Sequence, residues 1–202
     1  MLDFLLTLSM AKMIPRSGWI THGVSISDVE SVADHTFSTA LLAMLLADLE
    51  IESGHRVNAE RVVRMALFHD LSETLTFDIS KGYLDYLGNR GKKIKTEVEQ
   101  AAWRHVLKGV TKNKLRSNYA RLQAEFDAEQ TLESRIVHAA DRFDILLQVV
   151  EYAKRGYSKN LLANLWSMTE RDLRKSDLEP VRQLLKETRS LFPKAVGSKP
   201  PK

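Results

Sequence analysis

The chain has 202 residues, of which 44% are apolar and 28% charged, a balance typical of a folded globular domain. It contains no cysteine, which excludes disulfides, thiolate metal ligands and thiol catalysis, and which fits a reducing compartment such as the cytoplasm. The net charge of +4, from 30 basic and 26 acidic residues, is small for a protein that binds nucleic acid. We therefore expect a cytoplasmic globular protein without a nucleic-acid partner.

The N-terminal segment, MLDFLLTLSMAKMIPRSGW, has apolar residues at helical spacing from Phe4 to Met13. It has an acidic residue at Asp3 and no basic run before the apolar stretch, unlike a secretory signal peptide. We expect no other apolar run to approach the ~18 residues that are needed to span a bilayer. We expect neither a signal peptide nor a membrane helix.

Helical periodicity continues along the chain, with no convincing alternation of the kind that marks a strand. Ser31 or Asp34, Asn58 and Thr131 precede apolar segments as N-cap residues, and Pro180 follows Asp177 before the last segment. The sequence predicts an all-α bundle forming one domain over residues 1–192, with C-terminal helices in 158–192 and a flexible tail at 193–202. The remaining periodic segments are Phe37–Leu49, Val62–Leu71, Val98–Val110, Ile136–Val150, Leu161–Met168 and Val181–Leu191.

The basic residues are concentrated between Arg90 and Arg116, in RGKKIKTEVEQAAWRHVLKGVTKNKLR. Such a run is most often a solvated helix face and loop. An anion-attracting rim beside an active site is the alternative interpretation, and the sequence leaves it open.

Histidines and carboxylates interrupt two of the apolar segments. His35 begins the segment VADHTFSTALLAMLLADLE, where a lone histidine is more often a core or capping residue than a ligand. In ALFHDLSE, however, His69 and Asp70 are adjacent and Glu73 follows one helical turn after the histidine. That combination indicates a metal site where two helices meet.

Asp141 lies in the segment SRIVHAADRFDILLQVVEYA, which is apolar almost all round. An unpaired buried carboxylate is costly, and a divalent cation is one effective partner for it. Two imidazoles and two carboxylates form a mixed nitrogen and oxygen ligand set, which suits manganese, cobalt, nickel, iron or zinc better than calcium.

The order His35, then His69 and Asp70, then Asp141 resembles that of the HD-domain metal-dependent phosphohydrolase superfamily. Five blocks lie between residues 14 and 152, namely IPRSGW, ESVADHTF, MALFHDLSE, FDI and LLQVVEY. Together they resemble, more closely, the YfbR-like 5′-deoxynucleotidase family. The resemblance implies a single HD-domain helical bundle and one divalent ion per subunit, whether manganese, cobalt, nickel, iron, zinc or magnesium.

By this resemblance His35, His69, Asp70 and Asp141 hold the metal, and Glu73 is a catalytic carboxylate beside it. Asp78 matches an acidic position near the leaving sugar in similar enzymes, with a catalytic and a substrate-binding role. Phe77 stands before it where similar proteins commonly have glycine, which is expected to narrow the pocket or to move Asp78.

Two further residues are expected to bind substrate. Arg16 offers a planar double donor for a phosphate, and Trp19 is expected to shape the sugar site. A surface arginine and a core tryptophan are the alternatives for these two residues.

The leading interpretation is a metal-dependent phosphomonoesterase that hydrolyses ribo- or deoxyribonucleoside 5′-monophosphates to nucleoside and phosphate. The alternatives are an HD-domain phosphodiesterase, a guanosine-alarmone hydrolase, or a non-catalytic regulatory module that binds metal or nucleotide. Similar proteins form homodimers, and Leu161–Trp166 and Val181–Leu191 could lie in such an interface or pack within one subunit.

Overall fold

The computed structural model describes residues 1–80, 84 and 86–192, and the expected flexible tail at 193–202 lies outside them. The described residues form no strand, and their β pairing is limited to a bridge between Pro15 and Ser31. The prediction of an all-α fold is confirmed. The helices of the described residues are α1 (Leu2–Met10), α2 (Ser17–Thr21), α3 (Val32–Glu52), α4 (Ala59–Phe68), α5 (Glu73–Thr76), α7 (Asn89–Lys108), α8 (Asn113–Ala128), α9 (Leu132–Lys154), α10 (Lys159–Arg174) and α11 (Glu179–Thr188).

Three of the predicted N-caps start the central helices. Ser31 and Asp34 form a reciprocal capping box at α3, in which each side chain accepts a hydrogen bond from the other residue's backbone N–H. Asn58 accepts from the Arg61 N–H at α4, and Thr131 accepts from the Ser134 N–H at α9. Such caps satisfy backbone donors that a helix leaves free, and they set where each helix begins.

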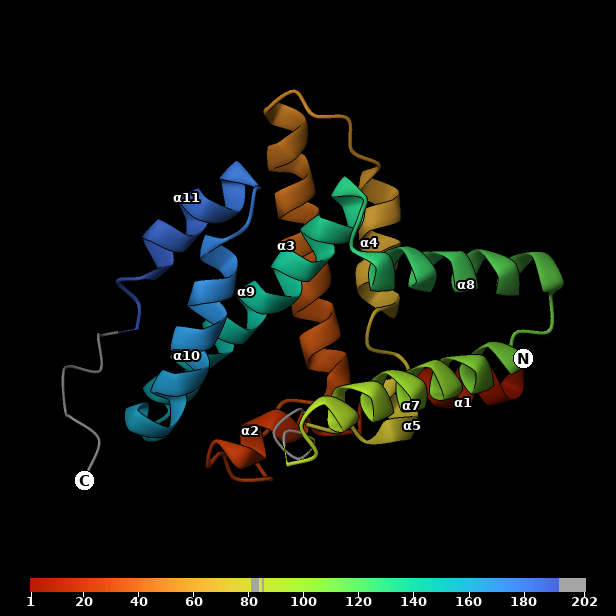
Figure 1. The fold of residues 1–202 in the computed structure, drawn as a ribbon, viewed down its shortest axis with the longest axis horizontal. Coiled ribbons are helices and arrows are strands. Elements are labelled where there is room, and N and C mark those ends of the chain that lie inside the picture. The colour runs from red at the N-terminus through yellow and green to blue at the C-terminus, as the bar shows by residue number, and fades with distance from the viewer. Residues whose placement is uncertain (81–83, 85, 193–202) are drawn as a thin grey trace.

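Helices α3, α4 and α9 form the centre of the bundle, where α9 packs across both other helices (Figure 1). Their facing sides are apolar and exclude solvent, as Leu46, Val62, Met65, Ile136 and Phe143 are at most 2% exposed. A second apolar cluster joins α1 to α7 through Phe4, Trp103 and Val106. The helix α8, which was not predicted, connects α7 to this centre.

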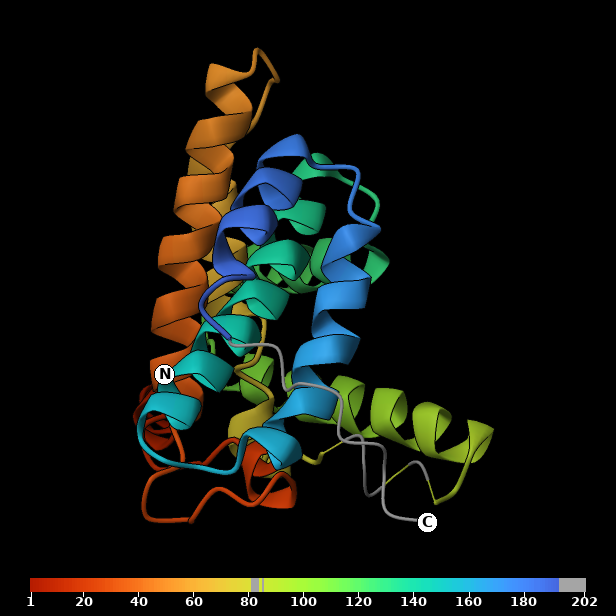
Figure 2. The ribbon, with the colours of Figure 1, turned by 90° about the vertical axis from the view of Figure 1, so that its left-hand side faces the viewer.

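The C-terminal helices α10 and α11 pack on one side of the bundle (Figure 2). Leu162, Trp166, Val181 and Leu185 belong to the same buried core as the central helices. These four residues therefore pack within their own subunit, whereas Leu161 and Leu191 are 53% and 50% exposed, so a role of these segments in a dimer interface stays a prediction.

The outer face of α3 is unusually apolar. Phe37, Leu41, Met44 and Leu45 are 44–64% exposed, while the opposite face of the helix is buried. By length and composition α3 could cross a membrane, with a mean hydropathy of 1.3 over a window that is 39% buried. The expectation that no segment reaches this length was wrong for Val32–Glu52, although α3 packs in the bundle against α4 and α9.

Candidate functional site

The predicted metal ligands meet where three helices converge. His35 lies in the first turn of α3, His69 and Asp70 directly follow α4, and Asp141 lies midway along α9. The predicted helix Val62–Leu71 ends at Phe68, because the His69 ring bonds to the Ala66 carbonyl and the chain continues in tight turns. This early end of α4 turns His69 and Asp70 toward the other two helices.

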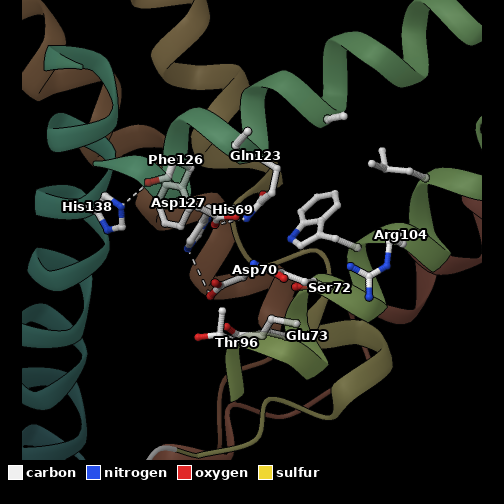
Figure 3. A pocket seen from close by; sticks show the side chains of 16 residues that line it. His69, Asp70, Ser72, Glu73, Thr96, Arg104, Gln123, Phe126, Asp127 and His138 are labelled. Atoms are coloured by element: carbon white, nitrogen blue, oxygen red, sulfur yellow. Dashed lines mark hydrogen bonds and ion pairs between the residues drawn. The ribbon is translucent and has the colours of Figure 1, made fainter. Parts of the chain in front are cut away.

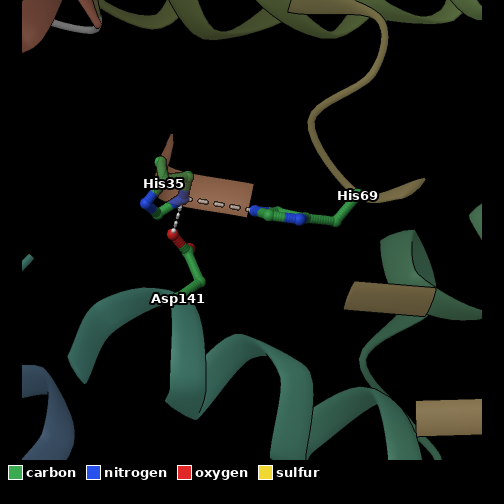
Figure 4. Close-up of side chains that lie close together, drawn as sticks. All are labelled: His35, His69 and Asp141. Carbon is green, nitrogen blue, oxygen red and sulfur yellow. Dashed lines mark hydrogen bonds and ion pairs between the residues drawn. The ribbon is translucent and has the colours of Figure 1, made fainter. Parts of the chain in front are cut away.

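The side-chain atoms of these residues surround one point. The Nε2 atom of His35 lies 3.1 Å from Asp141 Oδ1 and 3.4 Å from the Nε2 atom of His69 (Figure 4). It also lies 3.4 Å from Asp70 Oδ2. The Nε2 atom of His69 lies 3.2 Å from Asp70 Oδ2. His35, His69 and Asp141 offer ligand atoms within 4.8 Å of one another. These three residues fit a divalent cation, and Asp70 places a second carboxylate next to both imidazoles while it also pairs with Arg16.

Both imidazoles are also oriented for metal binding. The Nδ1 atom of His35 lies 2.7 Å from Asp144 Oδ2, and the Nδ1 atom of His69 lies 2.7 Å from the Ala66 carbonyl oxygen. These acceptors hold a proton on Nδ1, which leaves each Nε2 lone pair free for an ion. Sequence reasoning missed Asp144 as a partner, although its spacing of three residues from Asp141 places both on one helix face.

The electrostatics of the group favour a cation. Burial opposes a charge on His35, but the hydrogen bonds that its ring donates to Asp141, Asp144 and Asp70 outweigh burial, and the pKa of His35 is raised well above its ordinary value. Burial likewise opposes ionisation of Asp70, yet His69 and Arg16 hold the pKa of Asp70 well below its ordinary range. A proton and a metal ion therefore compete for the same negative potential.

Arg16 bridges this group to two further acids. Its Nη1 atom lies 2.6 Å from Asp70 Oδ2, 2.7 Å from Glu73 Oε2 and 3.7 Å from Asp78 Oδ1. The pKa of Arg16 is raised, because these carboxylates outweigh the effect of its burial. The structure thus brings together the predicted residues Arg16, Asp70, Glu73 and Asp78.

Glu73 reaches the group from the first residue of α5, since α4 does not continue to it as expected. Its side chain is only 10% exposed. Burial and the charge of Asp70 raise the pKa of Glu73 well above its ordinary value, against the attraction of Arg16. A carboxyl group whose pKa is raised in this way holds a proton more readily than an exposed glutamate does.

Phe77 does not displace Asp78. Its side chain is 65% exposed, whereas Asp78 is 8% exposed and accepts a hydrogen bond from the Ser17 N–H at 2.6 Å. The Ser17 hydroxyl donates to the Asp78 carbonyl oxygen as well. Phe77 and Asp78 both have left-handed backbone conformations, with φ of 56° and 46°. Two non-glycine residues therefore adopt the left-handed conformation that glycine would favour in this turn.

Replacing Phe77 with glycine is expected to raise the free energy of unfolding by about 0.5–1 kcal/mol. A left-handed conformation costs a residue with a Cβ about 1–2 kcal/mol, whereas the extra freedom of unfolded glycine costs about 0.5–1 kcal/mol. Urea denaturation measures the change. Phe77→Ala is the matched control, because it removes the ring but keeps the Cβ, and an equal gain in this variant would refute the backbone explanation.

Trp19 lies in the core. It is 4% exposed, its indole N–H donates to Glu30 Oε1 at 2.7 Å, and its ring packs edge-on against Tyr152 with centroids 5.0 Å apart. Burial raises the pKa of Glu30 to about 7. Trp19 thus supports the turn after Arg16, and a contact between Trp19 and a sugar stays a prediction.

A cavity of about 580 Å³ opens from the ligand group toward α7 and α8 (Figure 3). His69, Asp70 and Glu73 form one wall, and Arg104 lies on another. Most of the basic stretch from Arg90 to Arg116 is an exposed helix face, as the first interpretation expects. Arg104 alone among the basic residues of that stretch lines this cavity.

Comparisons with known proteins agree with this geometry. A family model described as an HD domain matches residues 8–180. The 5′-deoxynucleotidase hdd1 of Schizosaccharomyces pombe is 31% identical over 173 residues, which cover 81% of this chain and 78% of that protein. The human 5′-deoxynucleotidase HDDC2 is 27% identical over 200 residues, which cover 99% of this chain and 91% of that protein.

A solved structure shares the fold. A conserved hypothetical protein of Pyrococcus furiosus superposes with a TM-score of 0.77 and 29% identity, covering 94% of this chain and 99% of that one. The matches extend over nearly all of the helices described above, including those that carry the ligand group. The chain therefore belongs to the HD-domain family, in the branch that contains the 5′-deoxynucleotidases.

Proposed function

We propose that this protein is a metal-dependent phosphomonoesterase that hydrolyses nucleoside 5′-monophosphates, with deoxyribonucleotides as the favoured class. The convergence of His35, His69, Asp70 and Asp141 on one point, beside Arg16 and Glu73, is the observation that carries the proposal. The relatives named as 5′-deoxynucleotidases support the choice of substrate.

The two histidines and two aspartates would hold one divalent cation. Such an ion stabilises charge on phosphoryl oxygens and lowers the pKa of a bound water. Arg16, whose Nη1 atom is shared among three carboxylates, would bind the phosphate oxygens through its planar fork. Glu73 would hold or move the proton during ester cleavage, and Asp78 would orient the leaving sugar hydroxyl.

Replacing Arg16 with alanine is expected to raise KM for a deoxynucleoside 5′-monophosphate by roughly 10- to 100-fold, the worth of one charge-assisted hydrogen bond. Steady-state kinetics measure KM, and equilibrium dialysis of manganese checks that metal binding is retained. Arg16→Lys restores the charge without the fork and should recover only part of the affinity. An unchanged KM in Arg16→Ala would remove Arg16 from phosphate binding.

The substrate class is tested by phosphate release from a panel of compounds. Chelator-stripped protein is resupplied with manganese, cobalt or magnesium and given 5′-monophosphates, their 3′ isomers, a cyclic dinucleotide and a guanosine alarmone. Release confined to the 5′-monophosphates is expected. Turnover of the dinucleotide or the alarmone would favour the corresponding alternative hydrolase, and bound metal with no release from any compound would favour a regulatory module.

We also propose that the protein is a cytoplasmic homodimer. The exposed stripe of Phe37, Leu41, Met44 and Leu45 on α3 supports this, because contiguous exposed apolar side chains of this size mark interaction surfaces. A second copy of α3 presents the same stripe, as a two-fold interface requires.

Replacing Leu41 with glutamate is expected to convert the dimer into a monomer, because it places a charge in the apolar stripe. Sedimentation velocity measures the change in mass. Met168→Glu is the matched control, since Met168 is 45% exposed on α10, away from α3. If Leu41→Glu is still a dimer, the interface does not include this stripe of α3.

A further inference from the structure

The backbone of Arg16 is paired with the segment that leads into α3. The Arg16 N–H donates to the Glu30 carbonyl oxygen at 3.0 Å, and the Val32 N–H donates to the Ile14 carbonyl oxygen at 2.9 Å. His35 follows in the first turn of α3. The arginine that would bind phosphate and the first of the proposed metal ligands are therefore attached to one short stretch of paired backbone, in which Glu30 is bonded to Arg16.

The side chain of Glu30 connects this paired backbone to α2. Its Oε1 atom accepts a hydrogen bond from the indole N–H of Trp19 at 2.7 Å. Arg16 is the N-cap residue of α2, and Trp19 lies within that helix. Because α2 is bonded to Glu30 through both residues, Glu30 fixes the orientation of the helix and the point from which the Arg16 side chain starts.

The same carboxylate lies beside the pair formed by His35 and Asp144. Glu30, His35 and Asp144 offer side-chain nitrogen or oxygen atoms within 4.8 Å of one another. The Nδ1 atom of His35 lies 2.7 Å from Asp144 Oδ2. Glu30 therefore lies between the turn that carries Arg16 and the ring of a proposed metal ligand.

Tyr152 of α9 holds the backbone of Glu30. Its hydroxyl accepts from the Glu30 N–H at 2.9 Å and donates to the Asp28 carbonyl oxygen at 3.4 Å. Tyr152 is fully buried, and its ring packs edge-on against Trp19. The N–H, the carbonyl oxygen and the carboxylate of Glu30 are thus each bonded to a different residue, which leaves Glu30 little freedom to move.

We propose that Glu30 is a positioning residue that holds Arg16 in place to bind a phosphate beside the metal ligands. The inference rests on the proposed function, since it assigns a residue that acts through Arg16. The Nη1 atom of Arg16 lies 2.6 Å from Asp70 Oδ2 and 2.7 Å from Glu73 Oε2, so a small displacement of its backbone breaks these contacts. A displacement of about 1 Å in a binding group can cost roughly 10²-fold in rate.

Binding of inorganic phosphate tests the inference without turnover. Isothermal titration calorimetry measures the dissociation constant of phosphate on the full manganese-loaded chain. Glu30→Ala removes the acceptor of the Trp19 N–H and is expected to raise this constant roughly tenfold, a usual coupling within one hydrogen-bond network. Glu30→Gln keeps an oxygen acceptor at the same place and should bind phosphate nearly as wild type does. Glu133→Ala is the matched control, because Glu133 is also partly buried and accepts the Asn58 N–H at the far end of α4.

A double-mutant cycle separates a positioning role from a general loss of structure. In the Arg16→Ala background, Glu30→Ala should cause no further loss of phosphate affinity, because the residue through which Glu30 acts is gone. A further loss of about tenfold in the double variant would overturn the inference. So would a Glu30→Gln variant that binds phosphate as weakly as Glu30→Ala, since the charge and not the hydrogen bond would then be responsible.

Manganese affinity is the readout that a merely structural role would change. Equilibrium dialysis should find it retained in Glu30→Ala, whose phosphate affinity falls. Equal losses of manganese and phosphate affinity would assign Glu30 to the support of the whole site and overturn its specific role toward Arg16.

Tyr152→Phe is a second variant, which removes the hydroxyl that accepts the Glu30 N–H and keeps the ring. It is expected to weaken phosphate binding in the same direction as Glu30→Ala, and by less, because the bond to Trp19 remains. If Glu30→Ala does not fold, this variant and Glu30→Gln carry the test. Wild-type phosphate affinity in Tyr152→Phe would then contradict the positioning role.

The two proposals fail in different ways. A wild-type protein that binds phosphate through Glu30 and Arg16 but releases none from nucleoside 5′-monophosphates would contradict the proposed function and keep the positioning role. A wild-type protein that binds no phosphate, or a Glu30→Ala variant that binds it as well as wild type, would overturn the positioning role whatever the phosphatase activity.

Discussion

Replacing Asp70 with alanine is expected to abolish metal binding and phosphate release together. Asp70 Oδ2 lies within 3.4 Å of the Nε2 atoms of both His35 and His69, so the carboxylate is shared by the whole ligand group. Loss of a supporting residue around a metal site costs about 10- to 100-fold in affinity, and loss of a ligand should exceed about 100-fold. Manganese binding by equilibrium dialysis and phosphate release under saturating metal measure both effects.

The matched control for this variant is Asp48→Ala, which removes an exposed carboxylate from α3. It is expected to bind metal and release phosphate as wild type does. Full metal affinity in Asp70→Ala, with circular dichroism showing an intact fold, would contradict its assignment as a ligand.

Replacing Glu73 with alanine is expected to lower kcat by roughly 10²- to 10⁴-fold, the usual worth of a positioned acid or base, while metal binding is retained. The distinction follows from the contacts, because Glu73 pairs with Arg16, whereas Asp70 lies within 3.4 Å of the Nε2 atoms of both histidines. Single-turnover phosphate release and metal dialysis on the same preparation separate the two effects.

Glu73→Gln is the companion variant, because it keeps the side chain's size and its capacity to accept from Arg16 but not its acid–base function. It should be as inactive as Glu73→Ala. Near wild-type turnover in Glu73→Gln would reduce Glu73 to an orienting partner of Arg16.

The sequence could predict that His35, His69, Asp70 and Asp141 lie close together, because buried polar residues in apolar segments need partners; that they bind a metal stays a prediction. His35 and Asp141 lie in segments that are otherwise apolar, and buried polar residues of this kind need partners. Their spacing along the chain also matches a known family order. The N-caps Ser31, Asn58 and Thr131 could be predicted because capping depends on only a few neighbouring residues.

The parts that sequence reasoning missed depend on contacts between distant segments. The partner role of Asp144 requires α9 to be rotated so that this carboxylate meets the ring of His35, 109 residues earlier. The cavity depends on α7 and α8, and α8 was not predicted because its apolar residues are sparse. The end of α4 at Phe68 depends on the bond between His69 and Ala66, which the apolar periodicity does not encode.

The expected consequence of Phe77 was missed for a different reason. Sequence reasoning expected a large side chain at a glycine position to narrow the pocket or to move Asp78. In the structure the backbone adopts the left-handed conformation and directs the ring outward, so Asp78 keeps its contact with Ser17. We therefore expect Phe77 to lower the free energy of unfolding and to leave the shape of the site unchanged.

The most direct test of the account is anomalous diffraction from crystals of the protein grown with manganese. We predict one strong anomalous peak per chain, coordinated by the Nε2 atoms of His35 and His69 and by carboxylate oxygens of Asp70 and Asp141. A peak elsewhere, or a fully ordered site that binds no manganese at saturating concentration, would contradict the assignment of these four residues as the metal centre.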